Sequence, residues 1–122
     1  MKENRKFPRL DLYYEGKIDV PLFKGERASL PMLVTSVSPD GASVALSNIP
    51  RMPDTGSLVT VRFENDGYRF VLPMKVAWAR QTGKRTELGL QMLLDQMPAE
   101  MAQLYARWIV HRFKDRGTPG GT

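Results

Sequence analysis

The sequence predicts a mostly β protein, in which six short antiparallel strands form a small barrel or sandwich and one C-terminal α-helix follows. Three observations predict this class. Apolar and polar residues alternate with a period of two over much of residues 10–93, as is typical of half-buried strands. Turn-forming combinations of Pro, Asp, Asn and Gly separate these segments. Beyond residue 95 the apolar period becomes that of an amphipathic helix.

The first three predicted strands cover residues 10–20, 28–37 and 42–47. The alternation of the first is interrupted near Gly16, which we interpret as a bulge. Pro31 has no N–H to donate to a neighbouring strand, so it predicts an edge or bulge near the start of the second. The sequence SPDG at residues 38–41 is a strong turn signal, because Pro suits the second position of a type I turn and Gly the fourth.

The last three predicted strands cover residues 58–64, 68–80 and 86–93. A loop rich in proline and polar residues, 48–56, precedes the fourth strand. Asp66 and Gly67 then predict a tight hairpin turn, since this pair tolerates the positive backbone angles that such turns require. Pro73 predicts a kink or bulge within the long fifth strand.

Residues 98–114 are predicted to form a helix with a single apolar stripe. This stripe consists of Met101, Leu104, Tyr105, Trp108 and Ile109. It suits either a cap over the barrel of the same chain or contact with a second subunit, so the oligomeric state stays open. We divide the chain into a flexible N-terminal arm, a barrel, a C-terminal helical segment and a disordered tail, at residues 1–9, 10–94, 95–116 and 117–122.

Composition narrows the possible functions. The 122 residues suit one domain with a modest core, and the net charge of +5 favours an anionic partner. Without cysteine there is no disulfide, thiolate metal site or thiol nucleophile. The lone histidine, His111, lies on the predicted helix, and no phosphate-binding loop, dinucleotide fingerprint or metal-ligand spacing is present. We therefore expect a binding protein and not an enzyme, with no cofactor and no metal.

The expected location is the cytoplasm, without membrane insertion. The N-terminal sequence lacks the apolar run of a signal peptide, and no segment is apolar over a length that crosses a bilayer. DNA binding is not expected, because the basic residues are spread along the chain and do not form a groove interleaved with aromatic residues.

The first informative motif is RKFPR at residues 5–9. Arg5 and Arg9 are four residues apart, and Pro8 keeps the segment extended or turning rather than helical. The planar donor fork of a guanidinium suits a phosphate or the acceptor edge of guanine. Taken alone, the segment also fits a solvated basic arm.

The second informative motif is SVSPDG at residues 36–41. Ser36 and Ser38 are two residues apart, so their hydroxyls project from the same face at the end of a strand. Gly41 lets the chain pass close to whatever these hydroxyls contact. Taken alone, this segment also fits a hairpin turn with polar residues and no ligand.

Together the two motifs resemble the signature of the PilZ domain family: Arg-x-x-x-Arg before a first strand, and polar-x-Ser-x-x-Gly at the exit of a second. The sequence KVAWAR at residues 75–80, followed by ELGLQM at 87–92, is similar to the closing hairpin of that family. The resemblance covers roughly residues 5–93.

The resemblance implies a six-stranded antiparallel β-barrel that acts as a receptor for the bacterial second messenger cyclic di-GMP. It implies that the two arginines hold phosphate and guanine groups and that the polar turn contacts the ligand. An aromatic residue at the place of Trp78 borders the ligand in some members, although a core position would also explain this tryptophan. The candidate ligand-binding residues are Arg5, Arg9, Ser36, Ser38, Gly41 and Trp78.

Ser36 departs from the family pattern, which usually has Asp or Asn at this position. Loss of a charge-assisted hydrogen bond costs on the order of 1.5–3 kcal/mol, which weakens binding about tenfold or more. Two functions follow. The first is a cyclic di-GMP receptor or adaptor whose N-terminal arm changes conformation on ligand binding and signals to an unidentified protein partner. The alternative is a degenerate PilZ module that acts without nucleotide as a protein-interaction adaptor in motility, pilus or exopolysaccharide regulation.

Overall fold

The computed structural model describes residues 10–21, 25–47, 49, 51–65 and 67–115, and these form six β-strands, a short 3-10 helix and one α-helix. The elements are β1 (Leu10–Pro21), β2 (Arg27–Ser38), β3 (Gly41–Ser47), β4 (Leu58–Asn65), β5 (Tyr68–Thr82), β6 (Arg85–Met92), η2 (Leu94–Gln96) and α1 (Ala99–Asp115). The predicted arm at 1–9 and tail at 117–122 lie outside the described residues.

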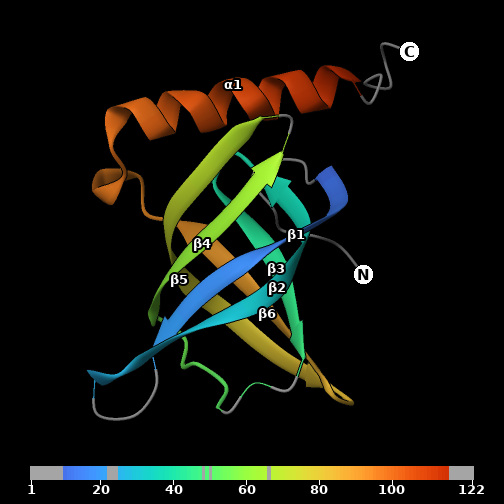
Figure 1. Ribbon diagram of the computed structural model, residues 1–122, viewed down its shortest axis with the longest axis vertical. Coiled ribbons are helices and arrows are strands. Elements are labelled where there is room, and N and C mark those ends of the chain that lie inside the picture. Colours follow the sequence, from blue (N-terminus) through green and yellow to red (C-terminus); the bar gives the residue numbers. More distant parts are fainter. Residues whose placement is uncertain (1–9, 22–24, 48, 50, 66, 116–122) are drawn as a thin grey trace.

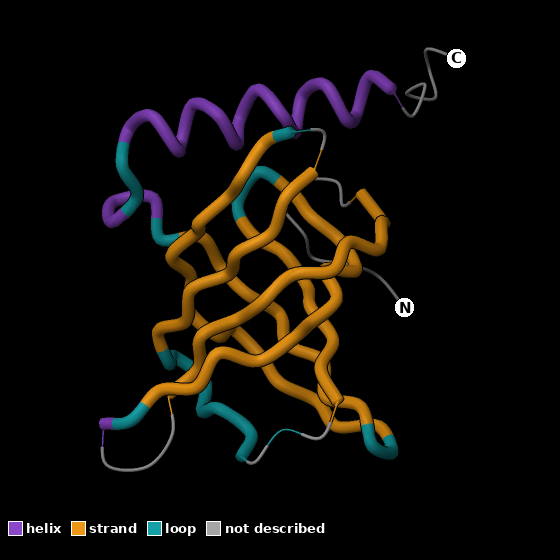
Figure 2. Tube along the Cα trace, viewed as in Figure 1, coloured by secondary structure: helices purple, strands orange, loops and turns teal. Residues whose placement is uncertain are grey.

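The six strands that the structure describes close into one antiparallel barrel, in the order β1-β2-β3-β6-β5-β4 (Figures 1 and 2). The predicted fold class is therefore confirmed, and of the two architectures that the alternation allowed, the structure is the barrel. Closure pairs β1 with β4, which joins the two ends of the sheet and removes its free edges.

The barrel interior is filled by the apolar half of each alternating strand. In β4, Val59, Val61 and Phe63 are buried while Leu58 and Arg62 between and beside them are exposed. This is the result expected when successive side chains point to opposite faces of a strand. The period-two pattern of the sequence thus places the core.

Gly16 does not form the bulge that the sequence predicted. It pairs regularly with Met32 on β2 and Phe63 on β4, and the irregularity of β1 lies between Asp11 and Tyr14. A Cβ at position 16 would lie 2.3 Å from the carbonyl oxygen of Arg62. Glycine is therefore required there by the close approach of β4 and not by a change of register.

Pro31 and Pro73, the two prolines inside strands, are each paired on one side only. Pro31 pairs with Lys17 on β1, but the pairing of β2 with β3 begins only at Leu33. This matches the edge position predicted for Pro31. Pro73 pairs with Thr60 without any shift of register, so the predicted bulge at Pro73 is wrong.

The irregularity of β5 lies instead between Val76 and Trp78, opposite β6. Val76 pairs with Leu90 and Trp78 with Gly89, so Ala77 is an extra residue on β5. Such a bulge reverses the inward and outward alternation beyond it. This local change decides where the side chain of Trp78 points.

Helix α1 lies across one end of the barrel and closes it (Figure 1). Tyr105, Trp108 and Ile109 on its apolar stripe are buried in the same core cluster as the strand residues. Trp108 contacts the rings of Phe63 and Phe70, and its Nε1 donates a hydrogen bond to Oδ1 of Asn65 at 3.0 Å. Of the two roles that the sequence left open for the stripe, the structure shows the cap.

Within the part of the chain that the structure describes, no helix combines the length and the apolar character needed to cross a bilayer.

Candidate functional site

A bulge in β2 directs the two motif serines to the outer face of the barrel. The pairing of β2 with β3 shifts between Val34 and Ser36, so Thr35 is an extra residue. Val34 and Val37 are both in the core although they are three residues apart. Ser36 and Ser38, on either side of Val37, therefore face outward together.

The turn that follows, residues 38–41, is held by one internal hydrogen bond and by hydrogen bonds from β6 and α1. The Ser38 hydroxyl donates to Oδ1 of Asp40 at 2.7 Å. The backbone N–H of Met92, at the end of β6, donates to the carbonyl oxygen of Asp40 at 2.8 Å. The Tyr105 hydroxyl donates to the carbonyl oxygen of Ser38 at 2.7 Å. The turn is thus fixed to β6 and to α1 before any ligand arrives.

Tyr105 is a site residue that sequence reasoning assigned only to the apolar stripe of the helix. It is 3% exposed, and its hydroxyl also lies 3.4 Å from the carbonyl oxygen of Gly41. Burial raises the pKa of the Tyr105 phenol far above its ordinary value, and the negative charge of Asp40 raises it further. The phenol therefore stays protonated and remains a donor to the turn. A hydroxyl within an otherwise apolar stripe was the available signal.

We expect Tyr105→Phe to destabilise the protein by about 1–2 kcal/mol, because the carbonyl oxygen of Ser38 loses its buried donor while the ring packing is kept. Chemical denaturation followed by circular dichroism measures this. Tyr68→Phe is the matched control, because it also removes only a tyrosine hydroxyl. Leu104→Ala, at a half-buried position of the same helix, would remove packing and not a hydrogen bond. Tyr68 is 40% exposed, and we expect its change to be within about 0.5 kcal/mol of zero. Equal effects at the two tyrosines would contradict the prediction.

Gly41 is needed because the backbone of β6, in the same chain, passes close to it. A Cβ at this position would lie 2.1 Å from the carbonyl oxygen of Leu90 on β6. The sequence suggested that Gly41 lets the chain pass close to the group that the serines contact. In the structure, β6 takes the space that a side chain would need, and Gly41 still lines the outer surface beside Ser38.

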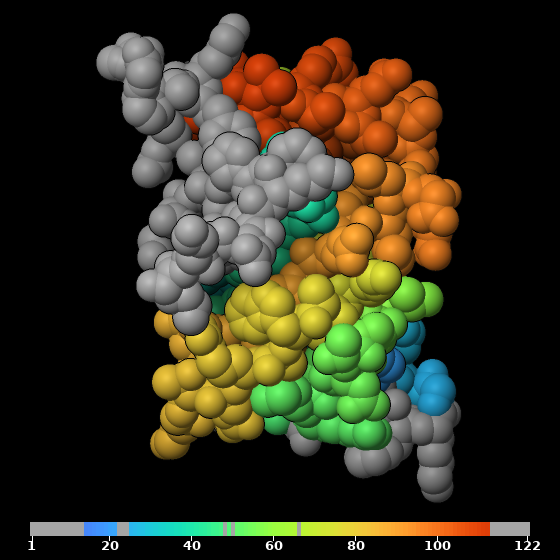
Figure 3. Space-filling model, turned by 180° about the vertical axis from the view of Figure 1, so that it is seen from behind, coloured from blue at the N-terminus to red at the C-terminus, as the bar shows by residue number. Residues whose placement is uncertain are grey.

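Ser38, Gly41 and Trp78 share one cleft of about 230 Å³ on the outer face of the barrel. The cleft is lined by Val37, Ser38, Asp40, Gly41, Ala42, Ala77, Trp78, Gly89, Leu90 and Gln91. Two distant parts of the sequence, the turn that contains Ser38 and Gly41 and the strand that contains Trp78, are therefore brought together. In the view from behind, β2 and β3 (teal) lie between α1 (red) and β5 (yellow), with β6 and η2 (orange) beside them (Figure 3).

Trp78 forms the rim of this cleft and does not belong to the core. The bulge at Ala77 turns it outward, and it is 39% exposed. Its indole lies over Gly89, where a Cβ would meet Nε1 at 2.1 Å. The Arg80 guanidinium lies 5.6 Å from the centre of the indole and forms an ion pair with Glu87. The Arg80 guanidinium also donates a hydrogen bond to the Glu87 carboxylate, and this bond holds the pKa of the Glu87 carboxyl below its usual value.

A row of outward-facing residues continues from the cleft across four strands. Ser36 pairs with Ser43 on β3, Ser43 with Gly89 on β6, and Gly89 with Trp78 on β5. Ser36 does not line the cleft itself but lies in this row beside it. The sequence did not single out Ser43 or Gly89, because which residues lie opposite one another depends on the bulges in β2 and β5.

Ser36 and Ser43 are buried although they face outward. They are 3% and 6% exposed, and neither hydroxyl has a hydrogen-bond partner among the residues that the structure describes. A buried hydroxyl without a partner costs about 1–3 kcal/mol. Two such groups side by side are therefore an unusual feature of this face.

The two candidate arginines cannot be placed relative to this face. Arg5 and Arg9 lie outside the described residues, so their part in the site remains a prediction.

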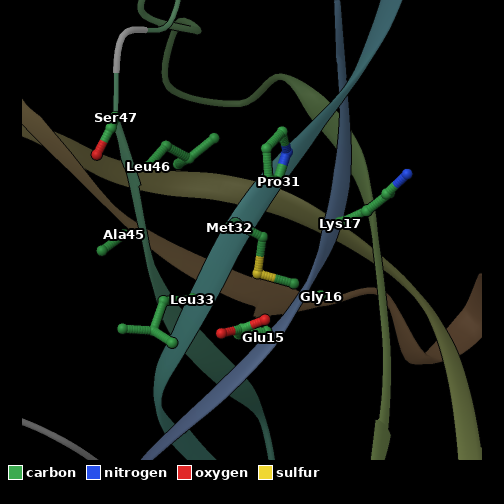
Figure 4. Close-up of a pocket in the computed structure, with 9 residues that line it drawn as sticks. All are labelled: Glu15, Gly16, Lys17, Pro31, Met32, Leu33, Ala45, Leu46 and Ser47. Carbon is green, nitrogen blue, oxygen red and sulfur yellow. The ribbon is translucent and has the colours of Figure 1, made fainter.

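A larger hollow, of about 580 Å³, lies elsewhere on the barrel, where β2 parts from β3 beside β1 (Figure 4). It is lined by Glu15, Gly16, Lys17, Pro31, Met32, Leu33, Ala45, Leu46 and Ser47. None of the candidate residues that the structure describes lies in it. The smaller cleft is the better candidate site because it gathers the polar turn, an exposed indole and two strand glycines.

The closed six-stranded barrel with its C-terminal helix defines the structural class of this chain, and the comparison with protein families agrees. A model described as "PilZ domain" matches residues 3–110. The chain therefore belongs to the PilZ domain family, and the resemblance found in the sequence is confirmed. The comparison with curated protein sequences gave no match.

Solved structures of similar fold include three bacterial proteins. The PilZ domain of YcgR from Escherichia coli, solved with c-di-GMP, has a TM-score of 0.70 at 13% identity, with 97% of this chain and 98% of that chain covered. The MrkH–c-di-GMP complex of K. pneumonia has a TM-score of 0.67 at 10% identity, covering 98% and 56%. The Bacillus subtilis inhibitor of motility MotI/DgrA has a TM-score of 0.65 at 13% identity, covering 93% and 53%. This chain thus spans about half the length of MrkH and MotI.

Proposed function

We propose that this chain is a cyclic di-GMP receptor whose ligand binds the outer face of the barrel at the cleft between Ser38, Gly41 and Trp78. The observation that carries the proposal is the meeting of these three residues, from β2, β3 and β5, in one cleft. Membership of the PilZ family supports it, as do two proteins of similar fold that were solved with c-di-GMP. The chemistry proposed is binding and not catalysis.

The size of the cleft suggests how the ligand is shared with the N-terminal segment. A volume of about 230 Å³ is below the roughly 300–1,000 Å³ of a typical small-molecule site. The cleft therefore suits one part of a dinucleotide, such as one base against the indole of Trp78. The phosphates need cationic partners, and we assign them to Arg5 and Arg9 because guanidinium groups bind phosphate in a planar, two-pronged geometry.

Isothermal titration calorimetry with cyclic di-GMP tests the proposal. We expect binding by the full chain and at least a tenfold loss of affinity in Arg5→Ala and in Arg9→Ala, because each removes a charge-assisted contact of about 1.5–3 kcal/mol. Arg69→Ala is the matched control. Its side chain is 78% exposed, pairs with Glu64, and lies outside the cleft, so affinity should not change.

Two results would count against this function. If cyclic di-GMP produces neither a binding heat nor a shift in melting temperature, the proposed receptor function is wrong. If both arginine variants bind cyclic di-GMP with unchanged affinity, the proposed role of the N-terminal arm is wrong.

The signalling step is a further part of the proposal. Ligand bound by both the cleft and Arg5 and Arg9 would order residues 1–9 against the barrel and so create or hide a surface for a protein partner. Hydrogen exchange tests this, because the backbone amides of residues 1–9 should exchange more slowly with cyclic di-GMP than without it. A ligand generated inside the cell implies a cytoplasmic receptor.

A nucleotide-independent adaptor is the second candidate, and Ser36 is the observation that favours it. A neutral hydroxyl stands where the family usually has a carboxylate or amide, which reaches further. Capture of the same partner by the wild-type chain and by the Arg5→Ala, Arg9→Ala double variant would favour the adaptor. Capture that requires cyclic di-GMP and both arginines would favour the receptor.

A further inference from the structure

We propose that Ser36 and Ser43 together form a hydroxyl-pair subsite that binds the donor edge of a guanine, with Ser43 supplying the contact that the shorter Ser36 cannot make alone. This inference rests on the proposed function, because the guanine is taken to be one base of cyclic di-GMP. It goes beyond that function by assigning a ligand contact to a strand residue outside both motifs.

The position of Ser43 is the first support. Ser43 lies directly opposite Ser36 on the neighbouring strand, and both face outward. Cβ atoms of directly opposed residues are about 4.5–5.5 Å apart, so the two hydroxyls are close enough for the edge of one base to span both. Thr35, the bulge residue, donates a hydrogen bond through its hydroxyl to the carbonyl oxygen of Ser43 at 3.2 Å. This contact holds the two strands together beside the pair.

The second support is that both hydroxyls are buried and unsatisfied. Among the described residues neither Ser36 nor Ser43 has a hydrogen-bond partner, and both are more than nine-tenths buried. Native proteins satisfy most buried polar groups, so such a pair needs an explanation. A ligand that donates to both oxygens removes the cost of leaving them unpaired.

The third support is the surface that continues from the pair. Ser43 pairs with Gly89, whose missing side chain leaves room for the indole of Trp78. The row therefore runs from two hydroxyls through a glycine to an exposed aromatic ring. This arrangement offers polar partners for the edge of a base and an apolar surface for its face.

Hydroxyl oxygens accept hydrogen bonds, and guanine presents an N2 amino donor where adenine has none. The pair can therefore help the site distinguish cyclic di-GMP from cyclic di-AMP. A carboxylate or amide at position 36 would reach the base by itself. With serine there, a second hydroxyl from β3 shares that contact.

The test compares Ser43→Ala with wild type by titration with cyclic di-GMP and by thermal denaturation without ligand. We expect about fivefold weaker binding, as for the loss of one hydrogen bond. We also expect a higher melting temperature of the free protein, because an unsatisfied buried hydroxyl is removed. Loss of a merely structural hydroxyl would instead lower the melting temperature. Ser47→Ala, at the exposed end of β3, should change neither quantity.

A double-mutant cycle with Ser36→Asn tests the sharing of the contact. We expect Ser36→Asn to bind cyclic di-GMP more tightly than wild type, and Ser43→Ala to have a smaller effect in that background. The wild type should prefer cyclic di-GMP over cyclic di-AMP, and Ser43→Ala should reduce this preference.

Three results would overturn the subsite in distinguishable ways. If the wild type fails to bind cyclic di-GMP, the proposed function fails and the subsite fails with it. If the wild type binds and Ser43→Ala binds equally well, the subsite alone is wrong. If Ser43→Ala weakens binding but also lowers the melting temperature of the free protein, the hydroxyl supports the fold and not the ligand.

Discussion

Trp108→Ala is expected to destabilise the protein by about 3–5 kcal/mol, the range for removal of a large aromatic side chain from a core. The indole is 1% exposed and packs against the rings of Phe63, Phe70 and Tyr105 at the end of the barrel. Its hydrogen bond to Asn65 would also be lost. A total stability of 5–15 kcal/mol is typical of a domain, so this one substitution removes a large share of it.

Urea denaturation followed by circular dichroism measures the loss. Val110→Ala is the matched control, because Val110 lies on the same helix two residues away but is 57% exposed. Its effect should be within about 0.5 kcal/mol of zero. Similar losses in the two variants would mean that α1 does not cap the barrel in solution.

Gly41→Ala is expected to reduce both stability and cyclic di-GMP affinity. The added Cβ would lie 2.1 Å from the carbonyl oxygen of Leu90, a backbone atom that cannot move without shifting β6. Overpacking of this kind costs about 1–3 kcal/mol, and occasionally more. Leu90 and Ser38 also line the cleft, so a shift of either strand changes the proposed binding surface.

Gly16→Ala separates the two effects. Its Cβ would lie 2.3 Å from the carbonyl oxygen of Arg62, a clash of the same kind between β1 and β4 and away from the cleft. We expect both variants to melt at lower temperature, and only Gly41→Ala to bind cyclic di-GMP at least tenfold more weakly per folded molecule. Equal affinities in the two variants would show that the turn at Gly41 does not shape the binding surface.

Local sequence patterns were sufficient to predict the strands and the helix. The alternation in β4 and the stripe containing Trp108 each depend on neighbours within one element, where the sequence period corresponds directly to a face. The SPDG turn at residues 38–41 was also predictable, because Pro and Gly have strong local backbone preferences. These patterns needed no knowledge of the distant parts of the chain.

The bulges were the features that local patterns located wrongly or missed. Gly16 and Pro73 looked like irregular positions because of their residue types, yet both lie in regular pairing. The extra residues at Thr35 and Ala77 have no such marker. A bulge is defined by the strand opposite, which the sequence of one strand does not contain.

The sequence by itself determined the mostly β class, the apolar stripe of the helix and the two motifs that identify the family. Only the tertiary structure decided that Trp78 faces outward, that Ser36 lies opposite Ser43, and that Tyr105 bonds to Ser38 across 67 positions. The physical reason is that periodicity records which side of an element is apolar. Register and closure, which bring separate elements together, arise from long-range pairing between all the strands at once.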